Sequence, residues 1–244
     1  MRIALALFLV IIFAAPASAA TPSRACVAAI KSANVRHRAI GIRPDCWRIG
    51  LLTLGMSQVA GQGVMGPPEA ARDIAINYRR QKYPLHEALY VYPRNLKSWL
   101  RLAPEPLEHF HAVTLHLFYW KDSLVAIRLG SDARIDSAPC TPSLPTRPFE
   151  RGGADYPFDF HGIALGAPMA AVSARFGRFA GTNRSRDFFN YWPVPLSFGG
   201  EGRVNEIGFS TGMAFAGIGG VAQFQLRRDP QTCLVRDYTV SLEG

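Results

Sequence analysis

The chain contains one short segment twice, and this repeat constrains the fold more than any other feature. Residues 54–66 and 165–177 each begin with a leucine and a glycine and end with a large apolar residue and a second glycine, 111 residues apart. Ser57 and Pro168, two residues after the first glycine, suit the start of a helix. A glycine after the apolar residue suits a helix C-terminus, which favours positive φ. The repeat predicts an α+β fold of two similar modules, each with a short helix packed on an antiparallel sheet.

The residues of the repeat resemble a known signature. They are similar to the Gly-Met-Ser/Thr…Val…Leu-Gly-x-Pro pattern of the small lipoprotein family of the outer-membrane barrel assembly machine, whose module occurs in tandem in the secreted β-lactamase inhibitor proteins. The resemblance implies the tandem fold and an inhibitor-like or assembly-factor-like role. Gly61 replaces the mid-helix valine of the first copy, and Phe179 the final proline of the second. The matching residues are Gly55, Met56, Ser57, Met65, Gly66, Pro68, Gly166, Val172, Phe176 and Gly177.

Residues 1–20 have the composition of an export signal. One basic residue, Arg2, precedes an apolar run that is too short to span a membrane, and small residues follow it. We therefore expect cleavage near Ala19 or Ala20, a periplasmic or secreted location, and no transmembrane span in the mature chain. A lipoprotein would need a cysteine directly after the apolar run, but Cys26 comes later.

Export makes disulfides the expected state of the four cysteines, Cys26, Cys46, Cys140 and Cys233. Three pairings are possible, and we favour Cys26–Cys46 and Cys140–Cys233. The cysteines do not form a Cys-x-x-Cys pair, so we expect no metal and no cofactor.

The formal net charge of +9 and the pI near 9.8 favour an acidic partner. An anionic envelope component or a protein is the expected partner. The sequence shows no recognition motif for nucleic acid, and export makes such a partner improbable.

Hydrophobic patterning divides the rest of the chain. Module one, residues 21–130, is expected to begin with a helix from Ser23 to Ile40 and to contain a second helix from Ala70 to Gln81. Alternating strands should follow at 86–92, 113–120 and 124–129. Residues 131–155 read as a proline-rich linker, and module two, residues 156–244, as mainly strands that end in a hairpin of 221–226 and 233–242.

Strand parity predicts one aromatic face in module one. The core face is expected to hold Val113, Leu115, Leu117, Tyr119, Leu89, Val91, Val125 and Ile127. The opposite face would then be either a partner-binding surface or a surface covered by the chain itself. Its candidate binding residues are Tyr90, Tyr92, His116, Phe118, Trp120 and Arg128.

Two patterns keep an exported hydrolase or metal-dependent enzyme as the alternative to a non-enzymatic binding protein. Ser210 is the centre of a Gly-x-Ser-x-Gly motif, but no histidine follows it in the chain, as the hydrolase order requires. His109 and His111 would share a strand face and could bind a metal, although a third ligand is missing. We therefore expect no catalytic residue.

Overall fold

The computed structural model describes most of the chain after the apolar leader. The described residues are 24–36, 42–92, 113–130, 134–136, 158–178, 181–182, 188–190, 194–200, 202–212, 214–218, 221–228 and 235–243. Their helices and strands, with one short 3₁₀ helix, confirm the predicted α+β class. The helices are α1 (Arg24–Val35), η1 (Pro44–Cys46), α2 (Gln58–Met65) and α4 (Met169–Phe176).

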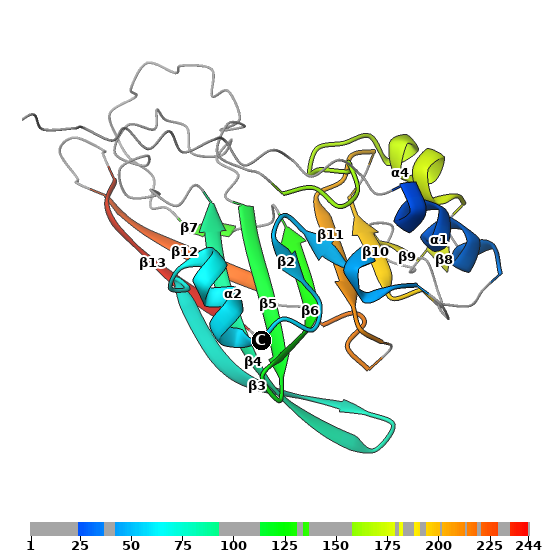
Figure 1. Cartoon of the computed structure of the whole chain (residues 1–244). Helices are drawn as coiled ribbons and strands as arrows, with labels where there is room; N and C mark the ends of the chain where they lie inside the picture. Colours follow the sequence, from blue (N-terminus) through cyan, green and yellow to red (C-terminus); the bar gives the residue numbers. More distant parts are fainter. Residues whose placement is uncertain are drawn as a thin grey trace, which may run out of the picture.

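The described strands form three sheets, the largest of which has eight strands in the order β3-β4-β5-β6-β11-β10-β9-β8 (Figure 1). A second sheet has the order β13-β12-β7, and β1 pairs with β2. The strands are β1 (Arg48–Ile49), β2 (Leu52–Thr53), β3 (Ala70–Tyr78), β4 (Gln81–Tyr92), β5 (Val113–Trp120), β6 (Ser123–Gly130), β7 (Arg134–Asp136), β8 (Gly181–Thr182), β9 (Phe188–Asn190), β10 (Leu196–Gly199), β11 (Glu206–Ser210), β12 (Val221–Arg228) and β13 (Val235–Glu243).

Strands from both predicted modules join in the eight-stranded sheet. All its neighbours are antiparallel, and β6 pairs with β11 at its centre, where Ile127 lies opposite Phe209. The segment predicted as a linker also contains a strand, because β7 pairs in parallel with β12. The two halves of the chain therefore share one continuous sheet and do not have separate ones.

Both copies of the repeated segment form the expected short helices. The Ser57 hydroxyl accepts a hydrogen bond from the Ala60 N–H at the start of α2 (3.2 Å), and Pro168 precedes α4. The closing glycines Gly66 and Gly177 have φ of 75° and 89°, the region that favours glycine. The predicted caps are thus confirmed, and a glycine is required at both helix ends.

Each copy is also attached to a hairpin in the same way. The Gly55 N–H donates to the Leu124 carbonyl, and the Leu124 N–H donates to Met56, both at 2.8 Å. In the second copy the N–H of Gly166 donates to Val204, and the Val204 N–H donates to Ala167. The repeat therefore extends from sequence into local hydrogen bonding around each turn and helix.

The helices cover one face of the eight-stranded sheet and form the larger core with it. Trp47 stacks near Phe160 and Phe209, and Phe176 near Phe198. These rings belong to one cluster that also contains inward residues of α1, α2, α4, β5 and β6. Burial of this apolar surface is the main force that holds the helices on the sheet.

Gly61 allows α2 to pack closely on the sheet. A Cβ at this position would lie 2.2 Å from the Tyr119 hydroxyl oxygen, whereas a Cβ at Gly63 would meet nothing within 4 Å. Tyr119 is buried, and burial raises the pKa of its hydroxyl. The glycine that departs from the valine of the signature is therefore explained by the tyrosine beneath it.

We expect Gly61→Ala to lower the free energy of unfolding by about 2 kcal/mol, because α2 or Tyr119 must move to make room. Gly63→Ala on the same helix is the matched control and should stabilise slightly, by up to about 1 kcal/mol, because alanine favours helix over glycine. Urea denaturation measures both variants. Equal effects of the two substitutions would contradict the close approach.

The predicted helix from Ala70 to Gln81 is wrong, because residues 70–78 form strand β3. Its side chains alternate between half-buried and exposed, with Ile74 and Ile76 on the half-buried face. Arg79 and Arg80 make the turn into β4 with φ of 48° and 65°. Two positive φ values are typical of a type I′ hairpin turn, but two arginines do not signal one in a sequence.

Other local predictions are confirmed. The first helix is observed from Arg24 to Val35; residues 37–41 lie outside the described part. The hairpins of β5 with β6 and of β12 with β13 are antiparallel, as expected. The signal segment 1–20 lies outside the described residues.

Candidate binding groove

The helices α1 and α4 come from opposite ends of the sequence but lie side by side (Figure 1). Asn34 near the end of α1 is buried, and its side-chain amide donates to the carbonyls of Phe176 (3.3 Å) and Arg178 (2.8 Å). These carbonyls at the end of α4 have no partner within their own helix. Asn34 therefore caps α4 and fixes the two helices next to each other.

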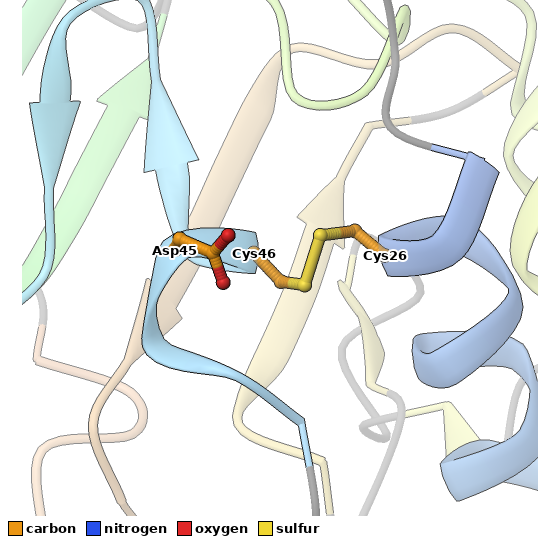
Figure 2. A group of neighbouring side chains, drawn as sticks. All are labelled: Cys26, Asp45 and Cys46. Carbon is orange, nitrogen blue, oxygen red and sulfur yellow. A yellow bond between two sulfur atoms is a disulfide. The ribbon is translucent and has the colours of Figure 1, made fainter.

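The disulfide Cys26–Cys46 anchors the other end of α1, and this predicted pairing is confirmed. Figure 2 shows the bond between the first turn of α1 and η1. His161, which is buried, donates from Nε2 to the Cys46 carbonyl (2.8 Å), and burial lowers the pKa of its ring. Arg175 of α4 donates to the His161 carbonyl (2.7 Å). Together these contacts connect α1, η1 and α4. Cys140 and Cys233 lie outside the described residues.

A groove of about 600 Å³ runs between α1 and α4 and is open to solvent. From α1 it is lined at positions i, i+3, i+4 and i+7, the spacing of one helix face. Alanines and a valine form its apolar part, and basic side chains accompany them. The lining residues are Arg24, Val27, Ala28, Lys31, Ala171, Ala174 and Arg175.

The groove is strongly basic. Segments 24–36 and 168–178 contain five basic residues and no acidic residue. Arg24 and Lys31 are exposed and form no ion pair with a carboxylate in the described part of the chain. Uncompensated cations along a concave surface attract anions and raise their rate of association. The arrangement is suited to binding a negatively charged partner.

The sequence analysis did not find this groove. A signal existed in the first helix, where Arg24 and Lys31 are seven residues apart and no acidic residue occurs. The other half comes from α4, which lies more than 130 residues later in the chain. Only the tertiary contact between α1 and α4 makes the two basic faces one site.

One cluster of possible metal ligands lies next to the groove. Cys26, Asp45 and Cys46 bring a carboxylate and two sulfurs within 4.8 Å of one another (Figure 2). Both sulfurs are in the disulfide, and the thiolate is the form that binds a metal. The Asp45 carboxylate forms an exposed ion pair with Arg43. In the oxidised protein, this cluster is a structural staple.

The prediction of one exposed aromatic face is wrong, first because of the strand register. Tyr90 lies opposite Leu115, and Leu89 lies opposite His116. Since cross-strand partners share a face, Tyr90 and Tyr92 belong to the helix-covered core, on the opposite face from His116. Both faces of β4 are buried, so hydrophobic alternation could not assign its parity.

Burial is the second reason. Tyr90, His116 and Phe118 are at most 1% exposed. Trp120 is half-buried and packs its ring near Tyr83 (5.5 Å) and Phe215 (5.9 Å). The chain itself therefore covers most of the predicted binding residues, which was the alternative that parity left open.

The face of the sheet away from the helices has a small apolar core and buried charges. In Figure 1, β12 and β13 lie behind β3 and β4, and β13 contacts β3. The apolar cluster on this face includes Leu85, Phe118, Val125 and Phe215. The second sheet and the loop around residue 215 thus give this face its cover.

Buried ionic groups lie beside that cluster. Glu87 is 0% exposed and accepts hydrogen bonds from His116 Nδ1 and Arg72 Nε, both at 2.7 Å. Burial acts to raise the pKa of Glu87, but the hydrogen bonds from His116 and Arg72 outweigh it, so the pKa is lowered. Arg128 pairs with Glu206 across β6 and β11 (2.7 Å). An ionised, fully bonded carboxylate in this place has a structural role.

The two patterns of the alternative enzyme hypothesis have different outcomes. Ser210 is buried at the end of β11, and its hydroxyl donates to the Gly212 carbonyl (2.8 Å). Bends follow it where a nucleophile elbow would have a helix. His109 and His111 lie outside the described residues.

None of the described helices is long and apolar enough to cross a membrane. Comparison with known proteins assigns no family: the chain matches no protein-family model, no curated protein and no solved structure.

Proposed function

We propose that this chain is an exported, non-enzymatic binding protein that holds a negatively charged partner in the groove between α1 and α4. The observation that carries the proposal is the groove itself, which has three basic lining residues and no acidic one. Its volume lies within the range of ligand sites, and its apolar floor provides area to bury. The high positive charge of the whole chain adds long-range attraction.

Several features support the exported location. Residues 1–20 have the composition of a signal peptide, and the buried disulfide at the groove is a bond that persists in oxidising compartments. The resemblance of the repeat to envelope and inhibitor modules supports a role in the periplasm or outside the cell. A protein or an anionic envelope component remains the proposed class of partner.

The test reverses charge at the groove. We expect the rim variant, Arg24→Glu with Lys31→Glu, to lose binding partners that the wild-type protein captures from an envelope extract, because attraction becomes repulsion. Both residues are exposed, and a glutamate at position 24 suits the first turn of α1, so the fold should persist. Captured material is quantified by mass spectrometry and lipid analysis at low and high salt.

The matched control is the hairpin variant, Arg80→Glu with Lys82→Glu. It changes the net charge equally, but its residues are exposed at the turn between β3 and β4. The hairpin variant should capture the same material as the wild type. If it loses as much as the rim variant, general charge and not the groove is responsible, and the proposed site is wrong.

A further inference from the structure

We propose that the occupant of the groove is an acidic amphipathic α-helix of a protein partner. This inference rests on the proposed function and names the kind of partner. Helices bind other proteins by placing an apolar face in a groove and specific side chains along its edges. The α1–α4 groove has both parts, since its floor is apolar and its edges are basic.

The floor has the shape that a third helix needs. Three of its four apolar residues are alanines, Ala28, Ala171 and Ala174, and the fourth is Val27. Small side chains let the axes of packed helices come close together. A helix with small or medium apolar residues facing the floor would complete a three-helix layer on the sheet.

The spacing of the cations sets the pattern of acidic residues in the partner. Arg24 and Lys31 are seven residues apart on α1, or about 10 Å along its axis. A helix that lies along α1 repeats its own face over the same two turns. Carboxylates at positions i and i+7 would therefore meet both cations. Arg175 on α4 would meet an acidic residue on the opposite flank.

The same geometry disfavours a lipid. A helix that binds a membrane surface needs a wide face of large apolar side chains, but the apolar residues here are alanines and one valine in a hollow. A single acyl chain needs a pocket that encloses most of its surface, whereas this groove is open to solvent. A helical segment tolerates one exposed face.

The probe is a phage-displayed library of 18-residue helical peptides, which is selected on the full exported protein. Binders are counter-selected against Ala174→Trp, which fills the groove from an exposed position. We expect enriched peptides with carboxylates seven residues apart beside an apolar stripe. The best peptide should bind the rim variant at least about ten-fold more weakly than the wild type or the hairpin variant.

A charge exchange makes the result specific. The same peptide with its two carboxylates replaced by lysines should bind the rim variant more tightly than the wild type. Selection without this spacing, or binding that Ala174→Trp does not reduce, would overturn the helix inference. Vesicles of phosphatidylglycerol are tested in parallel. If they bind through the groove and no peptide does, the helix inference fails while the proposed function stands; if neither depends on the groove, both fail.

Discussion

Glu87→Ala is expected to lower the free energy of unfolding by about 3 kcal/mol or more. Removal of the carboxylate leaves the ring of His116 and the guanidinium of Arg72 without their shared acceptor on a covered face of the sheet. Loss of one partner from a buried charge pair costs several kcal/mol, because the remaining charge is poorly solvated. Urea denaturation at neutral pH measures the loss.

The protein contains a matched control for this variant. Asp73 and His86 form a second carboxylate–histidine pair on the same hairpin, with Nδ1 and Oδ1 2.9 Å apart. The Asp73 side chain is 88% exposed, whereas that of Glu87 is 0% exposed. Asp73→Ala should therefore change stability by less than about 1 kcal/mol. If the two variants lose equal stability, burial of the Glu87 pair is not the cause.

The lowered pKa of Glu87 also predicts a dependence on pH. Because the folded protein holds this pKa below the ordinary value of 4.5, the ionised group stabilises the fold fully above about pH 4.5. That contribution is lost as the pH falls through the folded-state pKa. Glu87→Gln, which keeps the shape but not the charge, should therefore differ from wild type at pH 7 and approach it in acid. A constant difference across this range would contradict the assignment.

Features that depend on neighbouring residues were predictable from the sequence. The caps of α2 and α4 follow from Ser57, Pro168 and the closing glycines, because capping is a local interaction. The hairpin of β5 and β6 follows from alternation on both sides of a polar turn. The disulfide Cys26–Cys46 follows from a short separation in a chain expected to be exported.

Features that depend on distant residues were not predictable. The assignment of Tyr90 and Phe118 to one open face failed because β4 is buried on both sides and its register with β5 is not encoded in alternation. The strand β3 was mistaken for a helix because its partner β4 begins before the alternating segment was recognised. The groove needs α1 beside α4, and a buried Asn34 inside an apolar helix was the only local sign of that contact.

Loss of the Cys26–Cys46 bond should have the second large effect, and it should extend to binding. The bond closes a loop across 20 residues, and replacement of both cysteines by alanine should cost about 3 kcal/mol of unfolding free energy. It also ties down the first turn of α1, which supplies Arg24 and Val27 to the groove. Cys26→Ala with Cys46→Ala should therefore weaken groove binding even under conditions where the protein remains folded. Guanidinium denaturation and peptide binding measure the two effects, and free thiols at these positions in the untreated protein, by mass spectrometry, would refute both.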